Sequence, residues 1–227
     1  MSETIITVTG SADTHHAPER AIVQLALGFE GPQRQDVFEQ TRELHAETSE
    51  SLRALHGPVA DAVTRWSADQ VSVWGQRPWS QDGAQLPPVY HATTTVRARF
   101  RDFAALATWL DSVAFRDGVS VSSIDWTLTS STQAALQADA RRNAIVSARE
   151  KAQSYAEALG LSTLRPIAVA DPGMLGDGGG NGNSSPVGVA RFASHEMATS
   201  GSGGPLDLTP ADVVVSASVE ARFAATA

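Results

Sequence analysis

Residues 20–58 read "RAIVQLALGFEGPQRQDVFEQTRELHAETSESLRALHGP", and the spacing of the apolar side chains changes within this stretch. At its start, apolar residues alternate with others, at Val23, Leu25, Leu27 and Phe29. This alternation predicts a half-buried β-strand that ends at Gly31. From residue 33 to residue 56 the apolar positions recur every three or four residues, which predicts an amphipathic helix.

The same alternation of strand and helix patterns continues along the chain. We predict strands at 64–75, 87–100 and 119–129, a hairpin connection at 76–86, and a helix at 102–115 with Asp102 as its N-cap. From residue 20 to residue 129 the order is therefore strand, helix, strand, strand, helix, strand. This order predicts a ferredoxin-like βαββαβ core within an α+β fold.

The remaining segments flank this core. We predict a strand at 3–10, a turn at 11–19, a long helix capped by Ser130 or Ser131 and ended by Gly160, and strands at 164–170 and 211–224. We expect them to extend or back the ferredoxin-like sheet. The chain is thus predicted to be a single domain over 1–227, with the core at 20–129 and the parts at 130–170 and 206–227 completing the sheet layers.

The long helix carries a row of alanines at every fourth position: Ala140, Ala144, Ala148, Ala152 and Ala156. Such a row winds slowly around a helix of 3.6 residues per turn and lets another backbone come close. Two interpretations are open. The helix packs on its own sheet, or it packs between subunits.

Residues 171–205 are rich in glycine, serine and asparagine and contain neither phosphate-loop spacing nor an apolar pattern. We predict a flexible insertion. It serves either as a spacer or as a lid over a small-molecule site.

Composition excludes several classes of protein. The 227 residues include no cysteine, so disulfides, cysteine zinc sites and iron–sulfur clusters are excluded. A formal net charge of -8 disfavours nucleic acid and anionic lipid as partners. No segment has the roughly 20 apolar residues of a membrane helix, and the start "MSETIITVTG" lacks a signal-peptide pattern, so we predict no membrane insertion and a cytoplasmic location.

The histidines do not suggest a metal or catalytic site. His15 and His16 are neighbours in an extended segment, where consecutive side chains point to opposite faces. His45 and His56 lie three helical turns apart, about 16 Å along the axis, and cannot share a ligand. We predict no catalytic residue, metal or cofactor, with an enzyme whose site is unrecognised as an alternative.

The hairpin connection carries the residues best suited to touch a partner. Trp74, Trp79 and Tyr90 flank or occupy it, and aromatic side chains offer much contact area at little cost in rotamer freedom. We predict that these three residues contact a partner or a second subunit. The alternatives are that Trp79 folds back onto its own sheet or lines a small-ligand pocket.

Four motifs in a fixed order carry a resemblance to a known family. They are Gly10 with Ala17, Pro18 and Ala21; Arg101-Asp102 after a strand; the alanine-rich helix ending near Gly160; and the alternating strand 211–224. In these the chain resembles the SIMPL-domain family of bacterial proteins of unknown function, periplasmic immunogenic proteins and a mammalian molecule associated with a pelle-like kinase. The resemblance implies an α+β fold, a tendency to form oligomers and no established catalytic site. Many bacterial relatives are exported, and this chain departs from them in its start.

Together these observations predict a non-catalytic protein-interaction or self-assembly module that forms a homo-oligomer or binds a protein partner. The alternatives are a small-molecule sensor that uses residues 171–205 as its lid, and an enzyme.

Overall fold

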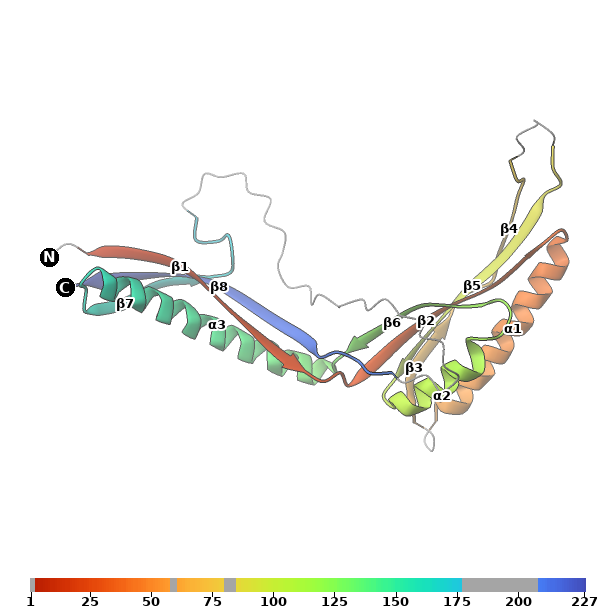
Figure 1. Cartoon of the computed structure of the whole chain (residues 1–227), viewed down its shortest axis with the longest axis horizontal. Coiled ribbons are helices and arrows are strands. Elements are labelled where there is room, and N and C mark those ends of the chain that lie inside the picture. Colours follow the sequence, from red (N-terminus) through yellow and green to blue (C-terminus); the bar gives the residue numbers. More distant parts are fainter. Residues whose placement is uncertain (1–2, 58–60, 80–84, 177–207) are drawn as a thin grey trace. The chain divides into compact units, whose positions relative to one another are not determined.

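The computed structural model describes residues 3–57, 61–79, 85–176 and 208–227 (Figure 1). In these residues it contains three helices and eight strands, which confirms the α+β class. The described residues divide into two compact units. Unit 1 contains 3–17, 128–176 and 211–227, and unit 2 contains 18–127 and 208–210.

Unit 2 is the ferredoxin-like core. Its elements are β2 (Arg20–Gly31), α1 (Arg34–Leu55), β3 (Val63–Ala68), β4 (Ser72–Gln76), β5 (Val89–Phe100), α2 (Phe103–Val113) and β6 (Val119–Thr127). The strands form an antiparallel sheet in the order β3-β5-β2-β6, and β4 pairs with β5. The predicted βαββαβ core is confirmed.

Alternating side chains of β2 and β5 form the core of unit 2. The strands contribute to this buried cluster Ala21, Val23, Leu25 and Leu27 from β2, and Val96, Ala98 and Phe100 from β5. They pack with Leu44 and Leu52 of α1 and with Leu106, Trp109, Leu110 and Val113 of α2. Both helices therefore cover one face of the sheet, and the other residues of each strand lie on the opposite, outer face.

Asp102 caps α2 as predicted. Its carboxylate accepts hydrogen bonds from the backbone N–H groups of Ala104 and Ala105, each at 3.0 Å. The preceding Arg101 forms an ion pair with Asp61 at 2.7 Å. The Arg-Asp motif therefore fastens the end of β5 and begins the helix that follows.

One predicted strand is divided. The prediction of a continuous strand over 64–75 is wrong, because the chain forms β3 and then β4, with a break at 69–71. Both pieces pair with the continuous strand β5, and the Thr94 hydroxyl donates to the Asp69 carbonyl at 2.8 Å beside the break.

Unit 1 is a second layer pair of one helix and one sheet. Its elements are β1 (Thr4–His16), α3 (Ser130–Ala158), β7 (Thr163–Ala170) and β8 (Val213–Thr226). The strands pair antiparallel in the order β1-β8-β7. These elements form a sheet of their own, so the expectation that they extend the first sheet is wrong. The grouping of both units into one domain stays a prediction.

Two boundaries in unit 1 also differ from those predicted. The turn predicted at 11–19 is wrong over its first part, because β1 continues to His16, which pairs with Val213 of β8. The N-cap of α3 is Thr129 rather than Ser130 or Ser131, and its hydroxyl accepts a hydrogen bond from the Thr132 N–H at 3.4 Å.

The alanine row of α3 packs on its own sheet. Four of the row's members, Ala144, Ala148, Ala152 and Ala156, form one buried cluster with Ile6 and Val8 of β1 and Val219, Ala221, Phe223 and Ala225 of β8. At Gly10 the approach is so close that an added Cβ would lie 2.7 Å from the Ala148 Cβ and nearer still to the α3 backbone. The row is therefore small because the helix backbone lies directly against β1.

The predicted flexible insertion at 171–205 lies mostly outside the described residues. Residues 171–176 form a turn after β7 that two charged side chains of β8 hold in place. The Glu220 carboxylate accepts from the N–H groups of Gly173 at 2.9 Å and Leu175 at 3.2 Å, and Arg222 donates to the Leu175 carbonyl at 2.9 Å.

We expect Glu220→Ala to release this turn, because both backbone N–H groups lose their acceptor at once. Amide hydrogen exchange at Gly173 and Leu175 should accelerate by about tenfold or more, which corresponds to about 1.4 kcal/mol of local opening. Arg165→Ala, which removes the exposed ion pair with Glu3 in the same unit, is the control and should leave these two amides unchanged. Unchanged exchange in Glu220→Ala would contradict the assignment.

Candidate interaction surfaces

The β4–β5 hairpin forms an arm of unit 2 (Figure 1). We define the arm as residues 72–79 and 85–93 of the described chain. Strand β4 pairs with β5 from Ser72 opposite Thr93 to Gln76 opposite Val89. In the described residues β4 has no second strand neighbour, so the arm presents a strand edge along with its side chains.

The arm places the three predicted contact residues differently. Trp79 is 82% exposed and does not fold back onto its sheet. Trp74 is 44% exposed and stacks on His91 of β5, with ring centroids 5.4 Å apart and planes 17° from parallel. Tyr90 lies over Gly75, where an added Cβ would come 2.9 Å from the tyrosine ring.

These three aromatics do not form one cluster. Trp74 is paired with His91, and Tyr90 is the residue before His91, so the Trp74 and Tyr90 side chains lie on opposite faces of the ribbon. The stack of Trp74 on His91 continues to Glu30, whose carboxylate lies 3.3 Å from the His91 Nδ1. This group was not predicted from the sequence, because the pairing of His91 with Trp74 depends on the register of β4 against β5.

Among the described residues, His15, His16 and His45 form no arrangement with a nucleophile or a metal site. His15 and His16 are consecutive residues of β1, so they point to opposite faces as predicted. On α1, His45 and Ser49 are four residues apart, and His45 Nε2 and Ser49 Oγ are buried without a hydrogen-bond partner in the described structure. No group of three or more His, Asp or Glu side chains able to hold a metal ion occurs in the part of the chain that the structure describes.

An open cavity of about 350 Å³ lies on the outer face of the unit 1 sheet. It is lined by Thr7, Val8 and Thr9 of β1, by Glu220 and Arg222 of β8, and by Leu175 and Gly176. Its two charged side chains already hold the turn at 171–176, so their polar atoms are committed to the fold.

One protein-family model matches most of this chain. The SIMPL model, described as "Protein of unknown function (DUF541)", matches residues 6–223. The chain belongs to the SIMPL family. The match spans elements of both units, from β1 to β8, and confirms the resemblance of the four motifs. No curated protein matches this SIMPL chain. Among the described residues of this SIMPL protein, no helix is both long enough and apolar enough to cross a bilayer.

The outer face of the unit 2 sheet carries a second surface of this SIMPL protein. Arg97 and Arg99 of β5 and Arg65 of β3 are exposed there, because they alternate with the buried residues of their strands. Arg65 lies directly opposite Arg99 across the strand pair. We call Arg65, Arg97 and Arg99 the arginine face.

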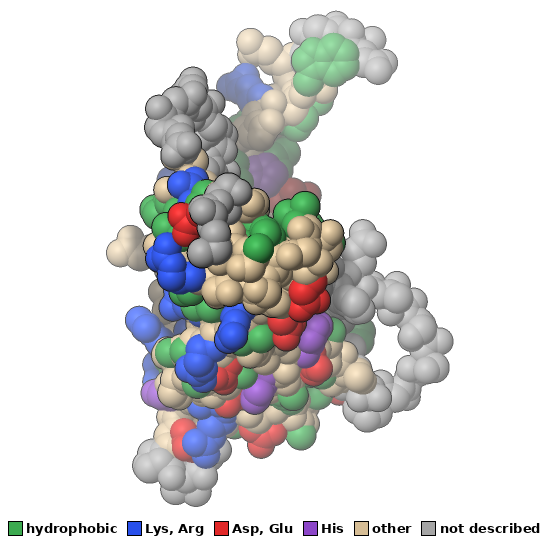
Figure 2. All heavy atoms as spheres, turned by 90° about the vertical axis from the view of Figure 1, so that its left-hand side faces the viewer, with side chains coloured by type: hydrophobic (Ala, Val, Ile, Leu, Met, Phe, Trp, Pro, Cys, Tyr) green, Lys and Arg blue, Asp and Glu red, His purple; other side chains and the backbone are tan. Residues whose placement is uncertain are grey.

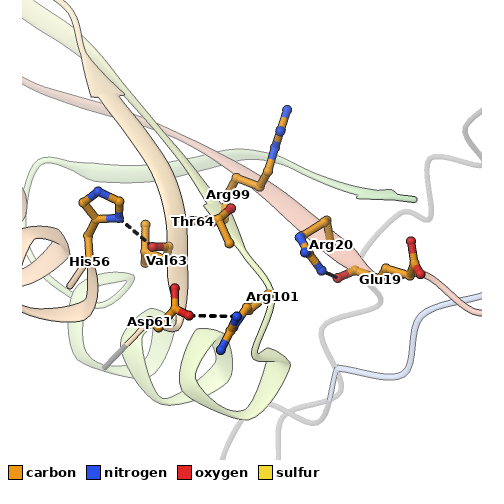
Figure 3. A network of polar contacts seen from close by, with 8 residues as sticks. All are labelled: Glu19, Arg20, His56, Asp61, Val63, Thr64, Arg99 and Arg101. Atoms are coloured by element: carbon orange, nitrogen blue, oxygen red, sulfur yellow. Dashed lines mark hydrogen bonds and ion pairs between the residues drawn. The ribbon is translucent and has the colours of Figure 1, made fainter. Parts of the chain in front are cut away.

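In the part of the chain that the structure describes, Arg65, Arg97 and Arg99 form no ion pair with an acidic side chain; Figure 3 shows the surroundings of Arg99. In Figure 3, Arg101 points to Asp61 and Arg20 donates to the Glu19 carbonyl, whereas the Arg99 side chain extends away from both. Arg97 donates to the neutral amide oxygen of Gln24 at 2.6 Å. Two like charges opposite each other destabilise a sheet, so this face has an electrostatic cost in the isolated chain.

Exposed basic and acidic side chains also lie together elsewhere on the protein. Figure 2 shows basic and acidic side chains beside one another, with small separate areas of hydrophobic side chains between them. Arg165 with Glu3, and Arg142 with Asp139, are ion pairs of unit 1 that follow this pattern. The arginine face differs from these mixed areas in carrying three exposed arginines, in a chain whose net charge is -8.

Proposed function

We propose that this SIMPL protein is a non-catalytic module that assembles with itself or binds a protein partner through the β4–β5 arm. The observation that carries the proposal is the exposure of Trp79, which is 82% exposed and follows the end of β4 at Gln76 by three residues. Burial of an exposed tryptophan ring against a partner surface removes a large apolar area from water, which contributes favourably to the free energy of binding. Leu86, 38% exposed on the other side of the hairpin, adds apolar area to the same arm.

The register of the arm supports this role. Trp74 is held by its stack on His91, and Tyr90 packs over Gly75, so both brace the ribbon that carries Trp79. A braced ribbon presents its side chains with little further loss of conformational freedom on binding. Among the strands that the structure describes, β4 pairs with β5 alone, so its other edge can offer backbone groups to a partner.

We expect Trp79→Ala to weaken assembly or partner binding by about tenfold or more in dissociation constant, the effect of losing an interface anchor. The measurement is light scattering coupled to size-exclusion chromatography over a concentration series. Because Trp79 contributes almost no buried surface to the fold, the unfolding midpoint should stay unchanged.

Phe115→Ala is the matched control, since Phe115 is 87% exposed and lies outside the arm, in the turn between α2 and β6. It should leave assembly unchanged. Equal weakening by both substitutions would contradict the assignment to the arm. A protein that stays monomeric at about 100 µM and captures no partner would contradict the proposal as a whole.

A further inference from the structure

The helix α1 carries the opposite charge to the arginine face on the other side of unit 2. Its solvent side has a row of exposed carboxylates at spacings of three or four residues: Asp36, Glu39, Glu43, Glu47 and Glu50. At 100° per residue these five positions fall within one narrow stripe along the helix. We call them the acidic stripe.

Part of the acidic stripe is neutralised within the unit. Glu47 is paired with Arg116 and Glu50 with Arg53, and Glu39 accepts a hydrogen bond from the uncharged Gln35. The negative charge is thus concentrated in the first half of the stripe. The buried side of α1, with Val37, Leu44 and Leu52, packs on the sheet.

The two surfaces lie on opposite sides of the same layer pair. Arg97 and Arg99 alternate with Val96, Ala98 and Phe100, whose side chains pack toward the helices. The arginine face therefore points away from α1, and the acidic stripe points away from the sheet. No single copy can bring its own acidic stripe onto its own arginine face.

The spacing of the two surfaces matches. Side chains two residues apart on a strand lie about 6.8 Å apart, which is the distance between the positions of Arg97 and Arg99. Residues four apart on a helix lie about 6 Å apart along the axis, as Glu39 and Glu43 do. Two guanidinium groups on β5 can therefore face two carboxylates on one helix side at the same time.

We infer that the arginine face docks the acidic stripe of α1 from a second copy of this chain. The inference rests on the proposed function in taking the protein as a self-assembling module, and it names a surface that the arm does not contain. Charge complementarity selects this occupant, since the second copy supplies a row of carboxylates and removes the cost of placing Arg65 opposite Arg99.

The contact joins different surfaces of the two copies and is therefore heterologous. In such a pair, one copy still has a free acidic stripe and the other still has a free arginine face. Such contacts repeat, and they give a ring when the rotation closes or an open chain when it does not. Assembly through this contact should weaken as salt is raised from about 50 mM to about 500 mM.

The test is a charge exchange between the two surfaces. The first variant combines Arg97→Glu with Arg99→Glu, and the second combines Glu39→Lys with Glu43→Lys. In each variant alone both surfaces carry the same sign, so association at low salt should weaken by about tenfold or more. When the two variants are mixed, each altered surface meets its complement, and association should return toward the wild-type value in light scattering or sedimentation.

A control variant with Arg141→Glu and Arg149→Glu changes the charge by the same amount on exposed positions of α3. It should associate as the wild type does. Circular dichroism verifies that all variants are folded. Lack of recovery in the mixture of folded variants, or equal weakening by the control, would overturn the inference.

The same measurements distinguish the contribution of the arm to assembly from that of the arginine face. If Trp79→Ala weakens assembly and the charge exchange has no effect, the proposed function holds and this inference fails. If the charge exchange restores association and Trp79→Ala has no effect, the reverse is true. A wild-type chain that remains monomeric at low salt would overturn the inference regardless of any other partner the arm binds.

Discussion

Gly10→Val is expected to destabilise unit 1 by about 3 kcal/mol or more, because β1 has no room for a side chain at this position. A Cβ at residue 10 would lie 2.7 Å from the Ala148 Cβ and closer to the backbone of α3 at Ala144 and Ala148. The backbone atoms of a helix are held together by its hydrogen bonds, so one of them cannot move away from the new side chain without the others. The whole of α3 would have to lift from the sheet, which would expose the alanine row and the cluster around Ile6 and Val8.

The expected result is measurable in the helix itself. Far-UV circular dichroism in urea should show an earlier loss of helix, and amide exchange at Ala148 and Ala152 should accelerate. Gly57→Ala is the control, because an added Cβ there meets nothing within 4 Å, and it should change the free energy of unfolding by less than about 0.5 kcal/mol. A Gly10→Val protein with wild-type exchange in α3 would show that the helix does not rest on β1.

The role of Gly10 marks the limit of what the sequence could predict. The alanine row could be recognised from the sequence of the helix alone. The sequence left open whether the row packs on the chain's own sheet or between subunits. The residue that makes the close approach possible lies about 140 residues away, in a strand that pairs with the other end of the chain. No local pattern links Gly10 to Ala148, so only the structure could identify their contact.

The extent of β1 was missed for a related reason. Residues 11–16 are mostly polar, and a polar run before a proline is typical of a turn. These residues form strand because β8 continues beside them to Val213, and a strand at the side of a long partner can carry polar side chains on both faces. In contrast, β2 and α1 were predicted correctly because each buries one face, which imposes a clear period on its apolar residues.

The candidate surfaces were predictable to different degrees. The aromatic residues of the hairpin could be chosen by type, but the exposure of Trp79 and the stack of Trp74 on His91 depend on the register of β4. Arg97 and Arg99 share a face by simple alternation in one strand. The addition of Arg65 required the pairing of β3 with β5. That Arg99 forms no ion pair among the described residues could be seen only from the placed side chains.

Both surfaces belong to unit 2, and they use different physical means. The arm offers exposed aromatic area, and burial of this area contributes a hydrophobic free energy of binding that depends little on salt. The arginine face offers positive charge, and its attraction to carboxylates contributes an electrostatic free energy of binding that salt screens. Salt dependence therefore separates the contribution of each surface to any complex that the protein forms.

Phe100→Ala is expected to destabilise unit 2 by about 3 to 5 kcal/mol, the usual cost of removing a fully buried phenylalanine. Phe100 is 0% exposed at the end of β5, and its ring centroid lies 5.4 Å from that of Trp109 on α2. The same strand carries the arginine face on its other side. Loss of the ring leaves a cavity between the sheet and α2, and the contact that positions Trp109 is lost with it.

Tryptophan emission reports this transition directly, since all five tryptophans of the chain lie between residues 18 and 127, within unit 2. The urea midpoint followed by emission should fall strongly in Phe100→Ala and less in Phe100→Leu, which retains much of the apolar volume. Phe115→Ala removes an equal ring from a site that is 87% exposed and should shift the midpoint little. Equal shifts in Phe100→Ala and Phe115→Ala would contradict the packing of β5 against α2, and with it the outward direction of Arg97 and Arg99 on which the charge contact depends.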